Sequence, residues 1–402
     1  MSKVFFFNIP FHGHVNPSLG LVQELVKNGE EVIYYNNESF RDKIESVGAT
    51  FRRYSEKFYL DENYVTYDLT DLFKVHLELS VLILDELIED VKRDKPDYIV
   101  HDSLCPWGKY LAKVMNLPAI NTFTTLADEP NSFLMATGLT LAILSNIPNM
   151  LKVQKIKKEL RKKYSIKVSR YVDIMSNNED LNLVYTSKEF QPKSEKLLKD
   201  YKFVGPTSMY RIENMPKLNL NRKGDRPLLF ISMGTIFNNN RDFFNICAEA
   251  FGNMEIDVLM SVGKSIDIPT LTIPNNFTVK YYFEVPQLEI LKECNIFMTH
   301  GGMNSTHEGL YHGVPLIAIP QQQEQTHVAM QLVRTGSGIC LNKSKITSDL
   351  LKESVQKIMS DYSYRENALR MRDSFINAGG PGQAVKDILL YVGKKRIVQL
   401  IK

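Results

Sequence analysis

One glycine-containing segment in the second half of the chain has the residue types of a phosphate-binding turn. His300-Gly301-Gly302 follows a short apolar run, and Asn304 and Ser305 precede a stretch with helical apolar spacing. This pattern predicts a buried strand, a glycine turn and then a helix. The first turn of a helix presents unpaired backbone N–H groups and a partial positive charge, which together bind phosphate. The alternative is a turn that only connects a strand to a helix.

Two further blocks lie on either side of this turn. Val285-Pro286-Gln287 precedes it, and Glu324-Gln325 follows it. Glu308 lies one helical turn beyond the start of the predicted helix, where its carboxylate could accept hydrogen bonds from two ribose hydroxyls. The three blocks together predict a site for a nucleoside diphosphate that carries a sugar.

The chain resembles the family-1 glycosyltransferases, UDP-dependent enzymes of GT-B fold, and is most similar to their bacterial macrolide-type branch. Three blocks carry the resemblance, and their order and spacing match across almost the whole chain: Phe11-His12-Gly13-His14-Val15-Asn16-Pro17, Ser232-Met233-Gly234-Thr235, and Val285 to Gln325. One position departs from the family. Plant-type members have a tryptophan that stacks on uracil just before Val-Pro-Gln, where this chain has Glu284. We therefore do not expect strict preference for uridine.

The resemblance implies inverting transfer of glucose from UDP-glucose to a hydroxyl of a small apolar or aromatic acceptor, such as a flavonoid or macrolide. A histidine suits the removal of the hydroxyl proton, because its pKa lies near ambient pH. His14 matches the family's base, with His12 as its rival, and Asp102 matches the carboxylate that holds the base. The alternatives are that the histidines only pack at a loop and that Asp102 caps the following helix.

The resemblance also implies which residues bind the donor. The diphosphate is assigned to His300, Gly302, Asn304 and Ser305. The ribose is assigned to Glu308, and the sugar hydroxyls are assigned to Glu324 and Gln325. Weaker candidates for contacts with the nucleotide sugar are Val285, Gln287, Ser232, Thr235 and Ser261. The sequence contains no Asp-x-Asp pattern that could hold a metal ion. We therefore expect a metal-independent reaction with the UDP-sugar as co-substrate and no further cofactor.

Two series of alternating strands and helices must position these residues. Apolar runs near Val4, Val32 and Tyr98 are separated by helical stretches, and the alternation restarts at Leu228. Such alternation predicts parallel sheets with helices on both faces. The first helix is expected to have Asn16 as its cap, followed directly by a proline. The expected fold class is α/β, with two Rossmann-like doubly wound domains facing a central cleft, where such sheets bind ligands.

The domain boundaries follow from composition and from the resemblance. Residues 1–205 are expected to form an acceptor-binding domain, and residues 206–227 a linker with Gly, Pro and Asn throughout. Residues 228–382 would bind the nucleotide sugar. The resemblance implies that residues 383–402 form a helix that returns to the first domain.

Composition excludes several classes of protein. The 402 residues carry a formal net charge of +3, which gives no indication of nucleic-acid binding. Four scattered cysteines lack any Cys-x-x-Cys pair and indicate free thiols rather than disulfides or a metal site. We find no signal-peptide pattern, and the most apolar stretch, Phe133 to Ile147, is interrupted by polar residues. We expect a cytoplasmic protein, monomeric or weakly dimeric, without integral membrane association.

Two segments bear on the acceptor. The lysine-rich stretch Lys152 to Arg170 predicts an amphipathic helix that either lies on a membrane or covers the acceptor pocket. Apolar and aromatic residues of the family's variable segments suggest an apolar acceptor: Phe58, Tyr59, Tyr64, Tyr67, Phe123, Phe133 and Met135.

Four other functions share features with this sequence. The chain lacks the Gly-x-Gly-x-x-Gly of a dehydrogenase after its first strand and the Gly-x-Ser-x-Gly of an esterase. A UDP-sugar epimerase or a non-catalytic sugar-nucleotide-binding protein on the same scaffold stays open.

Overall fold

The chain divides into two compact units. The computed structural model describes residues 2–61, 64, 69–127, 146–168, 176–197, 199–210, 218, 220, 222, 224–235 and 237–401. Unit 1 consists of Met1–Tyr185, Lys193–Tyr210 and Gly379–Lys402. Unit 2 consists of Thr186–Pro192 and Arg211–Ala378.

Unit 1 is built on a seven-stranded parallel sheet with the strand order β3-β2-β1-β4-β5-β6-β7. Its strands are β1 (Lys3–Phe7), β2 (Glu31–Asn36), β3 (Thr50–Arg53), β4 (Tyr98–Asp102), β5 (Ala119–Phe123), β6 (Asn182–Val184) and β7 (Tyr201–Phe203). The central strands are buried on both faces, which explains their nearly continuous apolar runs. The order reverses direction next to β1, so that the predicted doubly wound sheet is confirmed.

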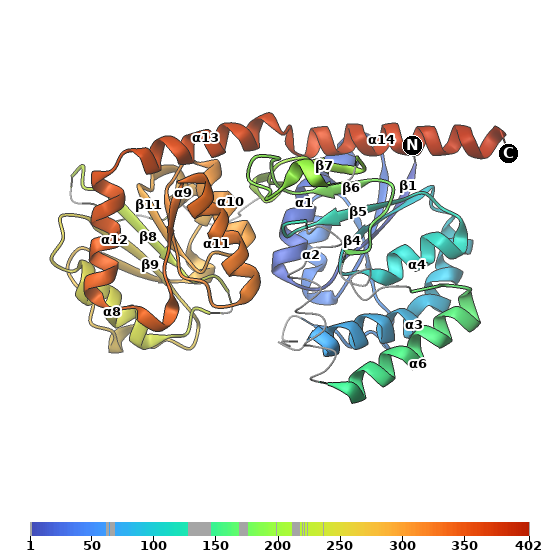
Figure 1. Cartoon of the computed structure of the whole chain (residues 1–402), viewed down its shortest axis with the longest axis horizontal. Helices are drawn as coiled ribbons and strands as arrows, with labels where there is room; N and C mark the ends of the chain where they lie inside the picture. Colours follow the sequence, from blue (N-terminus) through green and yellow to red (C-terminus); the bar gives the residue numbers. More distant parts are fainter. Residues whose placement is uncertain are drawn as a thin grey trace. The chain divides into compact units, whose positions relative to one another are not determined.

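Alternate residues of each strand serve the two faces of this sheet. Phe5 and Phe7 pack in one cluster with helices α3 (Leu69–Asp94), α4 (Pro106–Met115) and α6 (Ile147–Tyr164). Val4 and Phe6 pack on the opposite face with α1 (His12–Lys27), α2 (Arg41–Glu45) and α14 (Gly380–Ile401). Figure 1 shows α3, α4 and α6 grouped on one side of this sheet. The last helix therefore shares a core with the first strand and the first helix of the chain.

Helix α1 begins earlier than predicted. We expected Asn16 to be the cap, but the helix starts at His12 with Phe11 as its N-cap. The backbone N–H groups of His14 and Val15 both donate to the Phe11 carbonyl, each at 2.9 Å. Pro17 lies in the second turn, so its missing N–H takes no part in closing the first turn. His14 is consequently a residue of the first helical turn and not of the preceding loop.

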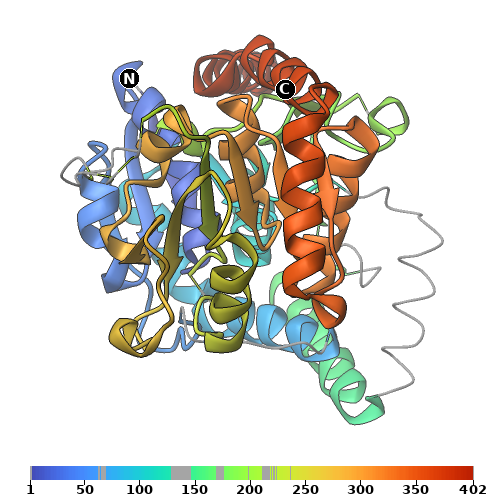
Figure 2. The same ribbon diagram turned by 90° about the vertical axis from the view of Figure 1, so that its left-hand side faces the viewer.

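Unit 2 is built on a six-stranded parallel sheet with the strand order β10-β9-β8-β11-β12-β13. Its strands are β8 (Leu228–Ser232), β9 (Asp257–Val262), β10 (Phe277–Tyr281), β11 (Ile296–Thr299), β12 (Leu316–Ala318) and β13 (Gly338–Cys340). Figure 2 shows strands of this sheet, coloured from olive to orange, side by side. The order again reverses next to the first strand of the unit, which confirms the second doubly wound sheet.

Helices cover both faces of the second sheet. Helices α8 (Arg241–Phe251) and α12 (Ser348–Ser360) pack in one cluster with the inward residues of β8, β9 and β11. On the other face, Gly309 of α10 (Met303–Tyr311) lies so close to the sheet that an added Cβ would be 3.0 Å from the Phe297 ring. The remaining helices of the unit are α9 (Gln287–Glu293), α11 (Gln323–Thr335) and α13 (Ser363–Asn377).

The segment Thr186–Pro192 belongs to unit 2, which the predicted division with a linker at 206–227 did not include. Its Phe190 ring contacts His307 at 5.2 Å and Phe375 at 5.8 Å, both between ring centroids. The Thr186 hydroxyl lies 3.0 Å from His307 Nε2. An isolated aromatic residue between two strands gives no sign of this packing, because the partners are distant in sequence.

The lysine-rich helix packs on its own unit. Met150, Val153, Ile156 and Leu160 of α6 are buried in the core of unit 1 together with residues of α3. The apolar side of the predicted amphipathic helix is thus used in internal packing. Among the described residues, no helix combines the length and the apolar character needed to cross a bilayer.

The close approach of α1 to the segment after β7 gives a test of the packing in unit 1. A Cβ at Gly20 would lie 2.5 Å from the Thr207 carbonyl oxygen and 3.1 Å from Tyr210 Cβ. Because one contact is with backbone, we expect Gly20→Ala to lower the free energy of unfolding by about 1–3 kcal/mol. Gly393→Ala is the matched control, since Gly393 lies within α14 with no atom near its Cβ position. It should be neutral or stabilising by up to about 1 kcal/mol. Thermal denaturation of both variants measures the difference, and equal melting temperatures would contradict the packing described.

Candidate functional site

The two residues predicted to activate an acceptor are brought together in unit 1. His14 Nδ1 lies 2.9 Å from Asp102 Oδ2. Asp102 is the last residue of β4, and His14 follows β1; these two strands are neighbours, with Phe7 opposite His101. The Asp102 side chain is fully buried, while 15% of the His14 side chain is exposed. A carboxylate held out of water next to a partly accessible imidazole fixes the ring and favours the tautomer with a proton on Nδ1.

A third strand end completes this arrangement. The hydroxyl of Thr124, which follows β5, lies 2.9 Å from His14 Nδ1. The second oxygen of Asp102 accepts a hydrogen bond from the Leu104 backbone N–H at 2.8 Å. The sequence analysis missed Thr124, although its place directly after a predicted strand is the same signal that selected Asp102. Because Nδ1 faces a carboxylate and a hydroxyl, the lone pair that can take up a proton lies on Nε2.

A buried polar network holds the backbone at His14. The Asn8 side-chain amide donates to the His14 carbonyl at 3.0 Å and to the Tyr34 hydroxyl at 2.8 Å. The Tyr34 hydroxyl also lies 2.7 Å from the hydroxyl of Ser18, which donates to the Val15 carbonyl. Burial raises the pKa of Tyr34 above its usual range, so the phenol stays protonated as a donor. The network fixes the position of the first turn of α1 relative to β1 and β2.

His12, the rival base, lies in a different environment. Its ring contacts the Phe40 ring at a centroid distance of 5.0 Å, and its Nδ1 lies 3.3 Å from Lys43 Nζ. Burial and the neighbouring ammonium lower the pKa of His12 to about 4. The geometry thus distinguishes the two histidines, because the carboxylate of Asp102 is next to His14.

In unit 2, the predicted phosphate turn lies at the carboxyl ends of neighbouring strands. Ser261 of β9, Ser232 of β8 and Thr299 of β11 are opposite one another in register and form one row across the sheet. Gly234 follows in this turn with φ of +76°, and a Cβ there would lie 2.6 Å from His300 Cε1. The Ser232–Thr235 turn and the His300–Gly302 turn are therefore in direct contact, and Thr235 is exposed beside them.

The turn leads into α10 as predicted. Gly301 has φ of +77°, a conformation that favours glycine, and Gly302 is the N-cap, which offers no side-chain cap. Asn304 and Ser305 lie in the first helical turn and are partly exposed. Burial lowers the pKa of His300 to about 4, so the ring is neutral at physiological pH. Positive potential for an anion therefore comes from the helix N-terminus and not from this histidine.

Glu308 is joined to the Val285–Gln287 block. The Gln287 side-chain amide donates to Glu308 Oε2 at 2.6 Å. Glu308 and Val285 are buried, while Gln287, the first residue of α9, is partly exposed. Two blocks separated by 20 residues in sequence thus converge at one end of α10.

The Glu324–Gln325 block lies next to the phosphate turn, and its side chains differ in environment. A Cβ at Gly301 would lie 3.4 Å from the Gln325 carbonyl oxygen. Glu324 is exposed in the first turn of α11. The Gln325 side-chain oxygen accepts hydrogen bonds from the backbone N–H groups of Gln321 and Gln322, so it caps the helix. Of the Gln325 side chain, the NH₂ group is therefore the part with capacity for a sugar hydroxyl.

The segment before Val285 shows how the chain accommodates Glu284. Its carboxylate accepts a hydrogen bond from the Tyr281 backbone N–H at 2.9 Å and caps a short 3₁₀ turn. Phe283 is 47% exposed, and its ring lies parallel to that of Tyr281 with centroids 5.6 Å apart. Lys264 Nζ lies 5.6 Å from the Phe283 ring centroid. Glu284 is thus exposed and held by backbone, as expected for a side chain that cannot stack on a base.

The residues expected to form an apolar acceptor pocket are dispersed. Phe58 and Phe123 are buried in two different clusters, and Tyr59 is half exposed. Tyr67, Phe133 and Met135 lie outside the described residues. No group of three or more His, Cys, Asp or Glu side chains with metal-binding geometry occurs in the part of the chain that the structure describes.

The sequence is similar to known glycosyltransferases. Residues 247–390 match the family described as erythromycin biosynthesis protein CIII-like, C-terminal domain. Over 402 residues, 98% of each chain, the sequence is 35% identical to the uncharacterized UDP-glucosyltransferase YojK of Bacillus subtilis (strain 168). It is 34% identical over 397 residues to the NDP-glycosyltransferase YjiC of the same organism, again over 98% of each chain.

A solved structure shares the architecture as well. The calicheamicin glycosyltransferase CalG4 is 28% identical and covers 98% of each chain with a TM-score of 0.82. The similarity extends along nearly the entire length of these relatives. The chain therefore belongs to the family-1 glycosyltransferases of GT-B fold, in their macrolide-type branch.

Proposed function

We propose that this glycosyltransferase moves glucose from UDP-glucose to a hydroxyl of a small apolar or aromatic acceptor, with inversion at the anomeric carbon and without a metal ion. The observation that carries the proposal is the 2.9 Å contact between His14 Nδ1 and Asp102 Oδ2. With a proton on Nδ1, His14 accepts the acceptor's hydroxyl proton at Nε2. The acceptor oxygen then forms a bond to the anomeric carbon as the bond from that carbon to the UDP oxygen breaks.

The leaving diphosphate needs compensation for its negative charge. The N-terminus of α10, the glycine turn before it and the partly exposed Asn304 and Ser305 supply backbone N–H groups and polar side chains at one place. His300 adds a neutral imidazole, since burial lowers its pKa to about 4. We propose that this set takes the role of a cation. A single displacement at the anomeric carbon then produces a β-glucoside from the α-linked donor.

The acceptor class rests on the relatives. The family matched by residues 247–390 is named for erythromycin biosynthesis, and CalG4 is a calicheamicin glycosyltransferase. From these names we extend to this chain a hydroxylated macrolide as the acceptor. A flavonoid is proposed from the family resemblance and the aromatic residues of the sequence, and not from these names. An epimerase or a sugar-nucleotide-binding protein would need no acceptor. Release of UDP that depends on an added acceptor therefore tests the proposal directly.

The first prediction from the proposed function concerns the base. His14→Ala should lower the rate of transfer by roughly 10²–10⁴-fold, the usual contribution of a general base. Asp102→Asn should lose part of the same factor, and the losses in the double variant should not add, because the two groups act as a unit. Initial rates of glucoside formation measure the effect. Binding of UDP, followed by calorimetry, should stay close to that of the unaltered chain.

His12→Ala is the matched control, since His12 occupies the same helical turn without contact to Asp102. It should retain most of the activity. Near-normal turnover of an unactivated hydroxyl by His14→Ala, or a complete loss with His12→Ala, would refute the assignment of the base.

The second prediction concerns the ribose. Glu308→Ala should weaken UDP binding by roughly 10–150-fold, corresponding to about 1.5–3 kcal/mol for a hydrogen bond to a charged group. The Michaelis constant of the acceptor should barely change. Glu289→Ala is the control, because Glu289 is an exposed carboxylate on α9 that pairs with Lys292. Unchanged affinity for UDP in Glu308→Ala would place the ribose elsewhere.

The third prediction concerns donor selection. The Glu284 carboxylate accepts a hydrogen bond from the Tyr281 backbone N–H, and the position has no aromatic ring that could stack on a base. We expect UDP-glucose to be the best donor and TDP-glucose to be used at a measurable rate. The sugar should be discriminated more sharply than the base, because an epimer leaves a polar group such as Glu324 unpaired. Initial rates over a donor panel, with excess EDTA in a parallel series, decide both points. The proposal would be contradicted if the enzyme used only uridine donors but accepted different sugars equally well. It would also be contradicted if EDTA abolished activity and Mg²⁺ restored it.

A further inference from the structure

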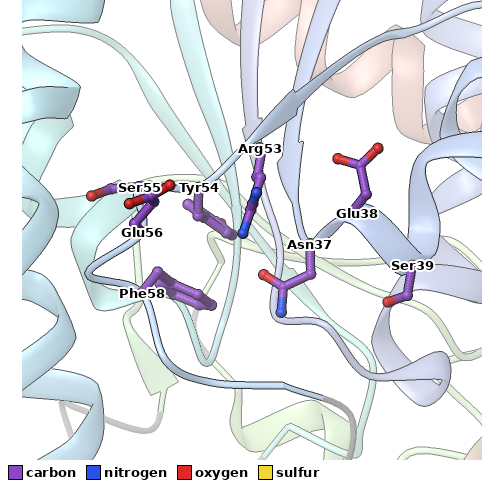
Figure 3. Close-up of a pocket in the computed structure, with 8 residues that line it drawn as sticks. All are labelled: Asn37, Glu38, Ser39, Arg53, Tyr54, Ser55, Glu56 and Phe58. Atoms are coloured by element: carbon purple, nitrogen blue, oxygen red, sulfur yellow. The ribbon is translucent and has the colours of Figure 1, made fainter.

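A cavity of about 350 Å³ lined by polar, charged and aromatic residues lies at the carboxyl ends of β2 and β3 in unit 1. Asn37 to Ser39, which follow β2, line one side of it. Arg53 to Glu56, at the end of β3 and just beyond it, line the other side, and Phe58 adds its ring (Figure 3). This volume is at the lower end of the range for small-molecule sites. The cavity has not been assigned a role in the proposed reaction.

The cavity is lined by both hydrogen-bond donors and hydrogen-bond acceptors, and by side chains of both charges. Glu38 is already paired, since Arg41 contacts its two carboxylate oxygens at 2.6 and 3.2 Å. Among the described residues, the side chains of Arg53 and Glu56 make no hydrogen bond or salt bridge, although the charge of Arg53 helps to lower the pKa of Glu38. Figure 3 shows the Arg53 guanidinium directed into the space above Phe58, with Asn37 beside this ring. The Asn37 amide nitrogen donates to the Leu60 carbonyl at 2.8 Å. With Glu38 paired to Arg41, the lining offers a ligand one guanidinium, from Arg53, and one further carboxylate, from Glu56.

Such a set of groups matches vicinal hydroxyls. Each hydroxyl can donate to a carboxylate and accept from a guanidinium, which an anion or a hydrocarbon cannot do. The Tyr54 and Phe58 rings are stacked at 4.2 Å and form an apolar edge of the cavity. A polyhydroxylated ring has both polar rims and apolar C–H faces. The lining therefore favours a neutral polyol over a flat hydrocarbon.

The cavity is at the same edge of the sheet as His14. The strand order β3-β2-β1-β4 separates the two places by about two strand spacings, on the order of 10 Å. They are also connected by hydrogen bonds, because the Tyr54 hydroxyl donates to the Asn8 carbonyl and the Asn8 side chain donates to the His14 carbonyl, each at 3.0 Å. A ring system of ordinary aglycone length can bridge this separation.

We propose that the cavity binds a polyhydroxylated ring, such as a sugar, at the end of the acceptor remote from the reacting hydroxyl. Arg53 donates to the hydroxyls of this ring, and Glu56 accepts from them. The inference rests on the proposed function, because it takes the reacting hydroxyl to lie at His14. It makes acceptors that already carry a distal sugar better ligands than the bare aglycone.

The test uses the full chain and two phenolic acceptors that differ only in a distal glucose. Calorimetry in the presence of UDP should show the glucose-bearing acceptor binding about tenfold more tightly, the effect of one hydrogen bond to a charged group. Arg53→Ala and Glu56→Ala should each remove most of this advantage and leave binding of the bare acceptor unchanged. Lys57→Ala should preserve the advantage, since Lys57 lies in the same loop and pairs with Glu86 instead of lining the cavity.

The outcomes separate the two proposals. Equal affinity for both acceptors, or an advantage that survives Arg53→Ala and Glu56→Ala, overturns the cavity's role. A bare acceptor with a distal carboxylate that binds more tightly than the glucose-bearing one, and loses this with Arg53→Ala, also overturns it in favour of an anion site. If the binding advantage is found but no glucose is transferred, the cavity proposal stands and the proposed function fails.

Discussion

The hydrogen bond between His14 and Asp102 exists because β1 and β4 are parallel neighbours. Parallel strands end at the same edge of a sheet, and the crossover helices bring successive strand ends to that edge. The Asp102 carboxylate is buried there, and His14 Nδ1 and the Leu104 N–H each contact one of its oxygens. A buried carboxylate without such partners would be neutralised. The order of strands in unit 1 is therefore the condition for a histidine that can act as a base.

The same constraint operates in unit 2 with a different chemical result. The carboxyl ends of β9, β8 and β11 place Ser261, Ser232 and Thr299 in one row. Glycines at positions 234 and 301 adopt positive φ, and the first lies against the His300 ring, so two turns can approach more closely than side chains would permit. The outcome is a helix N-terminus with polar groups around it and no carboxylate cluster among the described residues. In the proposed function, unit 1 offers a proton acceptor and unit 2 offers a place for an anion.

Side chains that could serve a ligand are partly engaged in the fold. Gln325 uses its carbonyl oxygen to cap α11, and Glu284 uses its carboxylate to cap a 3₁₀ turn. Gln287 and Glu308 bind each other at 2.6 Å. These contacts hold the groups in position before a ligand arrives, which lowers the cost of ordering them on binding. They also limit which atoms can contact a sugar. The number of hydrogen bonds that these side chains can make to a ligand is therefore smaller than their residue types suggest.

The sequence by itself determined the two doubly wound sheets, because strands buried on both faces have nearly continuous apolar runs and their spacing leaves room for crossover helices. It also determined the place of the glycine turn before α10, since strand ends can be located from these runs, and the resemblance to the family indicated His14 and Asp102 as a candidate pair. Only the tertiary structure decided that Thr124 joins this pair, that Thr186–Pro192 belongs to unit 2, and that α1 begins at His12. Each of these depends on contacts between segments far apart in the chain or on the closure of a single helical turn. Local residue patterns do not specify such contacts, because the free energy that selects them comes from packing and hydrogen bonds formed after the sheets are assembled.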